Sequence, residues 1–293
     1  MLFRSRFNAT LLTALGWVLA AGPLTGQTLA HLRTLSGFAA PEGVVVDPAT
    51  GMAYVSNMAS PPETFWQDTG KGFISRLRSD GTLDALRWLE STGAFVLNQP
   101  KGMAIQDGKL YVADNTRVLV ISLASARPLA ALKVAGAQQL NDMTADGRHV
   151  YVSDTATGKI LRLDLGAEGR HETVGEIEGI NGITVRLGGF YAVSWTLHEI
   201  YELSLTGAHG PKAFGLGPQF TNLDGIEVMP DGSFIVSDYM GRKVAAVSAD
   251  RRQVKTLYEL STPADLGIDH ERKRLYVPQL ESDTVVVLSL SAQ

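Results

Sequence analysis

Six short stretches of the sequence repeat one pattern, in which a variable second residue is followed by mostly apolar residues. The stretches are residues 41–46, 100–105, 140–145, 180–185, 223–228 and 263–268. Their second residues are Glu42, Lys101, Asn141, Asn181, Asp224 and Ala264. Carboxylate and amide oxygens are the ligands that hard divalent cations prefer. Four of the six positions therefore offer metal ligands, if the fold brings them together.

Glu42, Asn141, Asn181 and Asp224 would supply two carboxylates and two amide carbonyls. This set predicts a Ca²⁺ site, with another hard divalent cation as the alternative and water completing the coordination. The sequence has no cysteine and no histidine at these positions, which disfavours zinc. The plainer interpretation is that these polar residues only cap strands or bond neighbouring backbone.

The other two members of the series carry no ligand. Ala264 would leave space, for example for a substrate. Lys101 would be repelled by a nearby cation. We therefore expect Lys101 to lean towards Asp114 or Asp142 in a salt bridge, or else to hold an anionic group of the substrate.

The spacing of the series predicts the fold. The second residues lie 59, 40, 40, 43 and 40 residues apart, and each stretch is followed by a turn and further strand-like segments. A period of about 40 residues with several strands per unit is typical of propeller blades. We predict an all-β fold, a single six-bladed β-propeller over residues 27–293. The N-terminal segment 32–38 should join the last blade and close the ring.

In such a ring the six positions share one mouth with the loops that follow each second strand. The loop of the first blade, residues 58–72, is much longer than the others, and Phe65 and Trp66 are candidates for an aromatic lid over substrate. Trp195 could stack on a substrate ring, and His198 is the histidine that strand order places near the mouth. The alternatives are a loop packed on the rim, a tryptophan packed between blades and a surface histidine.

Polar residues also recur where the second strands end. The aspartates among them, expected to bond turns and adjacent blades, are Asp114, Asp154 and Asp238. The recurring serines are Ser56, Ser153, Ser194 and Ser237. No Gly-x-Ser-x-Gly turn surrounds these serines, so a serine hydrolase triad is unsupported.

The stretches P-E-G at Glu42, L-N-D at Asn141, I-N-G-I at Asn181 and L-D-G-I at Asp224 resemble a known family. This is the senescence marker protein 30/gluconolactonase/luciferin-regenerating enzyme superfamily, and the chain is also similar to the paraoxonase and diisopropyl-fluorophosphatase propellers. The resemblance extends over essentially the whole chain after the N-terminal segment. It implies that these four residues bind a catalytic calcium.

The resemblance further implies hydrolysis of a small-molecule substrate, a lactone or related ester, with the metal polarising the carbonyl. Asp224 would act as general base or nucleophile, a role for which metal-bound water competes. One alternative is a non-enzymatic propeller that binds a partner or ligand on its loop face. Another is a synthase of the strictosidine-synthase type, but that type lacks the metal ring.

Composition limits the partners and the compartment. The chain of 293 residues has a net charge of −4 and no basic block, which argues against nucleic acid as a partner. Arg4 and Arg6 precede a short apolar run, residues 9–21, which predicts an export signal over about residues 1–26. We expect a periplasmic or secreted monomer that is not inserted in a membrane once the signal is removed; an uncleaved N-terminus is the alternative.

Overall fold

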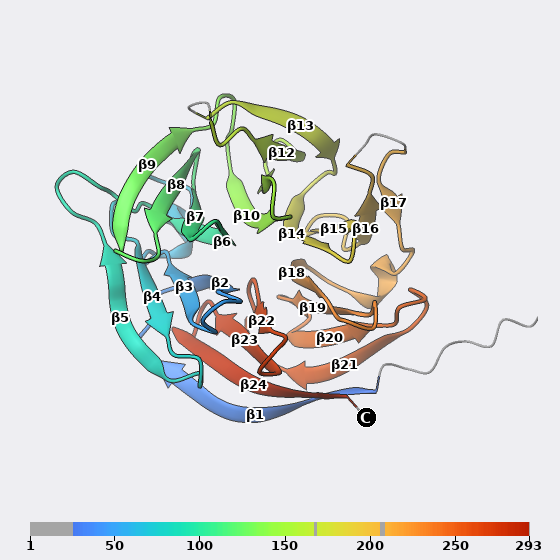
Figure 1. The fold of residues 1–293 in the computed structure, drawn as a ribbon. Helices are drawn as coiled ribbons and strands as arrows, with labels where there is room; N and C mark the ends of the chain where they lie inside the picture. Colours follow the sequence, from blue (N-terminus) through green and yellow to red (C-terminus); the bar gives the residue numbers. More distant parts are fainter. Residues whose placement is uncertain (1–25, 167–168, 206–208, 293) are drawn as a thin grey trace, which may run out of the picture.

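The computed structural model describes residues 26–166, 169–205 and 209–292. These residues form six antiparallel sheets of four strands, which are arranged around a central axis as the blades of a propeller (Figure 1). The predicted six-bladed β-propeller is therefore confirmed. The predicted export signal lies outside the described residues, apart from Gly26. In the described part of the chain, no helix is long and apolar enough to cross a membrane.

Each blade runs from an inner strand at the axis to an outer strand at the rim. The inner strands are β2 (Pro41–Val46), β6 (Pro100–Gln106), β10 (Leu140–Ala145), β14 (Ile180–Arg186), β18 (Leu223–Val228) and β22 (Gly267–Asp269). The second strands are β3 (Ala53–Asn57), β7 (Lys109–Asp114), β11 (Val150–Asp154), β15 (Gly189–Ser194), β19 (Phe234–Asp238) and β23 (Arg274–Gln279).

The third strands are β4 (Phe73–Leu77), β8 (Arg117–Ser122), β12 (Lys159–Leu163), β16 (Ile200–Leu203), β20 (Lys243–Val247) and β24 (Thr284–Ala292). The outer strands are β5 (Leu83–Glu90), β9 (Arg127–Lys133), β13 (His171–Glu176), β17 (Lys212–Ala213), β21 (Val254–Glu259) and β1 (Gln27–Ser36). Two short 3-10 helices, η1 (Pro62–Thr64) and η2 (Gly217–Gln219), lie in loops.

The ring closes through β1, as the sequence predicts. β1 is the outer strand of blade 6 and pairs with β24 from Gln27 opposite Ala292 to Ser36 opposite Thr284. The strand begins earlier than the expected segment 32–38 and ends before Gly37, whose φ of 95° lies in the left-handed region that favours glycine. The start of the chain thus covers an edge that blade 6 would otherwise leave open.

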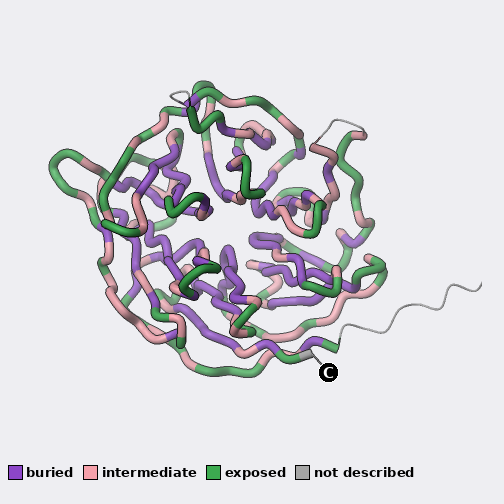
Figure 2. Tube along the Cα trace, in the orientation of Figure 1, coloured by how far each residue is buried: buried purple, intermediate pink, exposed green. Residues whose placement is uncertain are grey.

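The hydrophobic core is divided among the interfaces between blades. The buried apolar side chains form six clusters, and each cluster joins two neighbouring blades. At the closure, Phe38 and Val44 pack with Tyr276 and Val285. Figure 2 shows buried residues on the inner and middle strands and exposed residues on the rim and in the loops. Because the middle strands are buried on both faces, they read as nearly continuous apolar runs.

A β-bulge interrupts the inner strand of each of the first five blades. The register with the second strand shifts in the intervals 41–44, 100–103, 140–143, 180–183 and 223–226. The skipped residues are the second and third residues of the repeated stretches. A bulge re-aims its side chains, and this one turns the variable second residues towards the axis. In blade 6, β22 begins only at Gly267, and Pro263 forms an isolated bridge to Gln279.

Candidate metal and substrate site

Serines of the second strands hold the bulges in place. The backbone N–H groups of Gly43, Asp142 and Gly225 donate to the hydroxyl oxygens of Ser56, Ser153 and Ser237 at 2.8, 2.9 and 2.8 Å. Each of these N–H groups belongs to the residue that follows a variable position. These three serines are therefore structural groups that fix the inner strand, which accords with the absence of a nucleophile turn. The fourth recurring serine, Ser194, instead donates to the Glu178 carbonyl oxygen at 2.6 Å.

The recurring aspartates fix the chain that leads into the inner strands. Asp114 accepts hydrogen bonds from the N–H groups of Asn98 and Gln99 at 2.9 and 2.6 Å. Asp154 and Asp238 accept the corresponding bonds in blades 3 and 5. These bonds confirm the predicted turn role and anchor the connections that arrive at blades 2, 3 and 5 from the preceding blades. The variable residue follows these bonded N–H groups by two or three positions. In blades 3 and 5 its position is therefore fixed by the aspartate before it and by the serine that bonds the residue after it.

The six variable residues meet in one cavity of about 330 Å³ at a mouth of the ring. Its lining residues are Glu42, Met58, Phe65, Trp66, Lys101, Gln139, Asn141, Thr155, Asn181, Trp195, Asp224, Tyr239, Ala264 and Leu280. Every predicted metal-binding or substrate-binding residue except His198 is in this set. His198 has a positive φ of 57° and is partly exposed in the blade 4 loop, outside the cavity lining.

Three oxygen atoms at the floor of this cavity fit a cation. Glu42 Oε2, Asn141 Oδ1 and Asp224 Oδ1 are buried, and none of them forms a hydrogen bond with a described residue. The Asn141 amide donates its N–H to Thr155 Oγ1 at 3.1 Å, which leaves its oxygen unpaired. Buried acceptors are costly without a partner, and hard oxygens are what Ca²⁺ binds. These residues therefore fit the predicted ligand set.

We refer to the predicted ligand set, Glu42, Asn141, Asn181 and Asp224, as the cradle. The pKa values of its two carboxyl groups indicate that a positive charge would stabilise it. Burial raises the pKa of Asp224 to about 7, with Asp142 adding to the shift and a hydrogen bond from Asn181 opposing it. Burial and the neighbouring Asp224 also raise the pKa of Glu42 well above its usual range. Two buried carboxylates lose their hydration and repel each other, and a divalent cation would offset both the cost of burial and the repulsion. In the described part of the chain, no three histidine, cysteine, aspartate or glutamate side chains form a metal-binding group, so a site here would need the amides.

Lys101 does not form the expected salt bridge. Its ammonium donates to the carbonyl oxygen of Phe65 at 2.7 Å and of Gln99 at 3.3 Å, and it lies 3.9 Å from the ring centre of Trp66. Asp114 pairs instead with Arg117, at 2.8 Å. The prediction of a partner at Asp114 or Asp142 is wrong, because the long first loop reaches over and supplies uncharged partners. Burial lowers the pKa of Lys101 to about 8, although the Glu42 and Asp114 charges oppose the shift.

Five lining residues share a position that sequence reasoning used only in part. Each directly follows a second strand, and they are Met58, Thr155, Trp195, Tyr239 and Leu280. Only Trp195 had been singled out. The others could have been found from the same repeat, by taking the residue that directly follows each second strand. The end of the second strand lies at the same face of the ring as the start of the inner strand.

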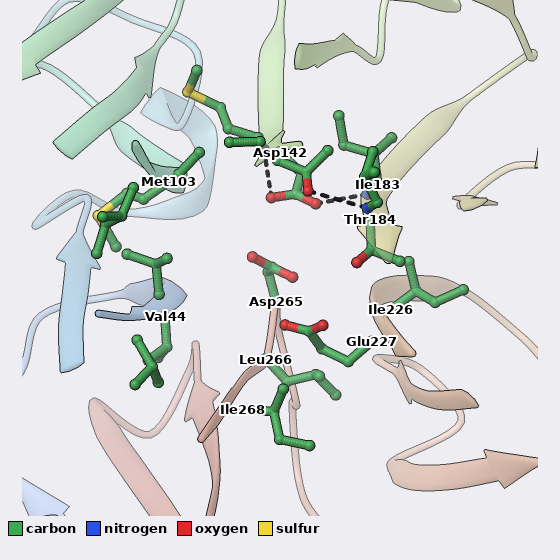
Figure 3. Close-up of a pocket in the computed structure, with 18 of the residues that line it drawn as sticks. Val44, Met103, Asp142, Ile183, Thr184, Ile226, Glu227, Asp265, Leu266 and Ile268 are labelled. Carbon is green, nitrogen blue, oxygen red and sulfur yellow. Dashed lines mark hydrogen bonds between the residues drawn. The ribbon is translucent and has the colours of Figure 1, made fainter. Parts of the chain in front are cut away.

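A second cavity, of about 250 Å³, lies towards the other end of the inner strands (Figure 3). Figure 3 shows the carboxyl groups of Asp142, Asp265 and Glu227 gathered at its centre. Asp142 and Asp265 stand where the other four blades have glycine, and the N–H groups of Met143 and Ile183 both donate to Asp142 at 2.6 Å. Burial raises the pKa of Asp142 to about 7 and that of Glu227 to about 8. Sequence analysis missed this group of carboxyls.

Comparisons with known proteins support the fold. No protein-family model matches the sequence, and no curated protein matches it. Among solved structures, a chain of a nidogen/laminin complex has a TM-score of 0.64 at 17% identity, covering 75% of this chain and 86% of that one. A Bacteroides thetaiotaomicron protein of unknown function has a TM-score of 0.67 at 13% identity, covering 90% and 76%.

A catalytically inactive variant of virginiamycin B lyase from Staphylococcus aureus, solved with quinupristin, is also similar. Its TM-score is 0.60 at 12% identity, and the match covers 90% of this chain and 99% of that one. At such identities the likeness shows the fold alone. The neighbours bear out the propeller part of the sequence resemblance, whereas the superfamily itself stays a prediction.

Proposed function

We propose that this chain is an exported, Ca²⁺-dependent hydrolase of a lactone or related ester, as its resemblance to the senescence marker protein 30/gluconolactonase superfamily implies. One observation carries the proposal. Glu42, Asn141 and Asp224, each with an unpaired buried oxygen, line one cavity whose other walls are largely aromatic and aliphatic. A cation held there would lie beside a substrate that fills the cavity.

The chemistry divides among a few residues. Glu42, Asn141, Asn181 and Asp224 would hold the cation, which when bound supplies Lewis-acid polarisation of a carbonyl. The Asp224 carboxyl, with a pKa raised to about 7, is partly ionised at neutral pH, and the ionised carboxylate can accept a proton from an attacking water. The neighbouring Asn181 amide favours the ionised form of this carboxyl by lowering its pKa, against the effect of burial. The aromatic side chains limit the access of bulk water to the cavity.

The test is lactone hydrolysis after chelation and after addition of Ca²⁺, carried out in ¹⁸O-labelled water. We expect chelation to abolish hydrolysis, Ca²⁺ to restore it, and one ¹⁸O atom to appear in the acid product. Asp224→Asn should lower kcat by at least about 100-fold without preventing folding, since it removes the base. Glu90→Gln, which changes an exposed carboxylate on β5, is the matched control.

Three results would contradict the proposal. They are hydrolysis that ignores chelation, hydrolysis that survives Asp224→Asn, and ring opening without incorporation of ¹⁸O. The last would indicate elimination, the class of reaction that the name of one fold neighbour denotes.

A ligand-binding propeller without catalysis is the second candidate. The same cavity favours it, because the cradle and the aromatic walls would retain a ligand whether or not it reacts. Calcium-dependent binding of lactones that are recovered unchanged would support this function over hydrolysis.

A further inference from the structure

We propose that the cavity selects an ester or lactone with a flat, apolar body, such as an aryl-fused ring, and that Lys101 is the positioning residue behind this selection. The inference rests on the proposed function, since it names the substrate class of the same site. The inference goes beyond the proposed function because it gives a role to Lys101, the charged residue among the six variable positions that is not a predicted metal ligand.

Aromatic side chains reach the cavity from opposite sides of the ring. Phe65 and Trp66 come from the long loop of blade 1, which is fastened to blade 2. Trp195 and Tyr239 follow the second strands of blades 4 and 5, and their ring centres lie 5.4 Å apart at 49°. In a ring of six, blades 4 and 5 stand opposite blades 1 and 2. A flat ring can therefore lie between two aromatic walls above the cradle.

Most polar groups on these walls already have partners. Tyr239 donates its hydroxyl to Glu281 Oε1 at 3.0 Å, Thr155 donates to the carbonyl of Ile180 at 2.7 Å, and Lys101 is bonded to the loop. The Gln139 amide and the indole N–H groups remain. A polyhydroxylated substrate would bring several hydroxyls out of water with few partners to meet them. An apolar body has no such cost.

Lys101 fixes the wall on the loop side. Its side chain is buried, at 2% exposure, and its ammonium bonds the Phe65 carbonyl and faces the Trp66 ring at 3.9 Å. A buried ammonium is stable only with such partners, so the two aromatic residues and the lysine hold one another in place. The charge at this ring position therefore acts through Phe65 and Trp66.

The ends of the loop are held independently of Lys101. Gln99 donates to Ser60 Oγ and Thr69 Oγ1, both at 2.9 Å, and Asn115 donates to Asp68 Oδ1 at 2.7 Å. Replacement of Lys101 should consequently release the central part of the loop while the blades and the loop ends stay in place. The expected result is a change in substrate affinity rather than a loss of the fold.

The first experiment compares hydrolysis of an aryl-fused six-membered lactone with that of a polyhydroxylated six-membered lactone by the calcium-loaded protein. We expect kcat/KM to favour the aryl-fused lactone by about 100-fold, because an apolar pocket discriminates against an added hydroxyl by roughly this factor. Lys101→Met should raise KM for the aryl-fused lactone roughly 10-fold with little change in kcat, since it removes a desolvated cation–π contact. Lys101→Arg should restore most of the affinity, and Lys71→Met, at an exposed lysine of the same loop, should behave as wild type.

The pairing with Trp66 gives a readout that a purely structural lysine would not. If Lys101 acts through Trp66, Trp66→Leu should raise KM to a similar extent, and the double variant should be no worse than Trp66→Leu alone. Preference for the polyhydroxylated lactone, or additive losses in the double variant, would overturn the inference.

The second experiment separates the failure of this inference from the failure of the proposed function. Binding of an aryl-fused lactam, which resists hydrolysis, is measured by calorimetry with calcium and with chelator. Wild type should bind it more tightly than Lys101→Met does and ignore a polyhydroxylated lactam. If no lactone is hydrolysed but this binding order holds, the proposed function fails and the ligand class stands. If lactones are hydrolysed while lactam binding is unaffected by Lys101→Met, the function stands and the role of Lys101 falls.

Discussion

The stability of the protein should depend on calcium, because the cradle that would bind the cation is assembled only in the folded chain. A ligand at 100 times its dissociation constant stabilises the folded state by about 2.7 kcal/mol. For domains of this size, 1 kcal/mol corresponds to roughly 2–4 °C in the melting temperature. Saturating Ca²⁺ should therefore raise the melting temperature of chelator-treated protein by about 5–10 °C at pH 8.

The same argument fixes the sign of the pH dependence. The pKa of Asp224 is raised to about 7 and that of Glu42 is also raised, so protons compete with the cation for these oxygens at low pH. Below pH 7 each pH unit should weaken binding about tenfold for one displaced proton. The calcium-induced shift at pH 6 should accordingly be smaller than at pH 8 by about 1.4 kcal/mol in free energy.

The assay is scanning calorimetry with a Ca²⁺ titration at both pH values. Asp224→Asn and Glu42→Gln should lose most of the shift, and Glu90→Gln, on the surface, should keep it. In chelator at pH 8, Asp224→Asn should melt no lower than wild type, because it removes a buried charge that repels Glu42. A melting temperature that ignores Ca²⁺ at both pH values, or a shift larger at pH 6 than at pH 8, would refute this reasoning.

Three further predictions concern the scaffold. The pKa values of Asp142 and Glu227 are raised to about 7 and 8 in the folded protein, so their stabilising contribution is present at low pH and is lost as the pH rises. In chelator, urea unfolding should show the free energy of unfolding falling between about pH 5 and pH 7, above the unfolded pKa values of these carboxyls and below their folded ones, by about 1.4 kcal/mol per pH unit for each proton retained on folding; a rise would contradict the burial argument. Gly182→Ala should cost about 1–3 kcal/mol, because its Cβ would lie 2.3 Å from the Asp224 carbonyl oxygen, whereas Gly93→Ala, with open space around it, should be neutral. Removal of residues 1–36 should expose the edge of β24 and cause association visible in gel filtration, unlike removal of residues 1–25 alone; an unchanged monomer would show that β1 is dispensable.

Most of the fold could be predicted from the sequence, because its determinants are local and repeated. The spacing near 40 residues sets the blade, and the alternation of apolar and turn residues sets its strands. Even the closure by β1 follows from counting, since the last repeat lacks an outer strand. The small errors, such as the limits of β1 and the late start of β22, lie where a left-handed glycine or an isolated bridge ends the pairing.

The candidate cradle was also accessible from the sequence. Equivalent positions in a cyclic repeat must face the same axis, so the residue types at Glu42, Asn141, Asn181 and Asp224 could be compared without coordinates. Their identity as a set, and the absence of histidine among them, came from the sequence alone.

Only the tertiary structure decided how the remaining side chains are paired. Phe65 and Trp66, which contact the Lys101 ammonium, come from a loop more than thirty residues earlier in the chain, and no local rule specifies where a long loop lies. The channel holds two cavities, and Asp142 and Asp265, the two third-position residues that are not glycine, line the second one together with Glu227. Burial and neighbouring charges shift the pKa values of Asp142, Asp224 and Glu227. These side chains become buried and close to one another's charges only when the blades assemble into a ring.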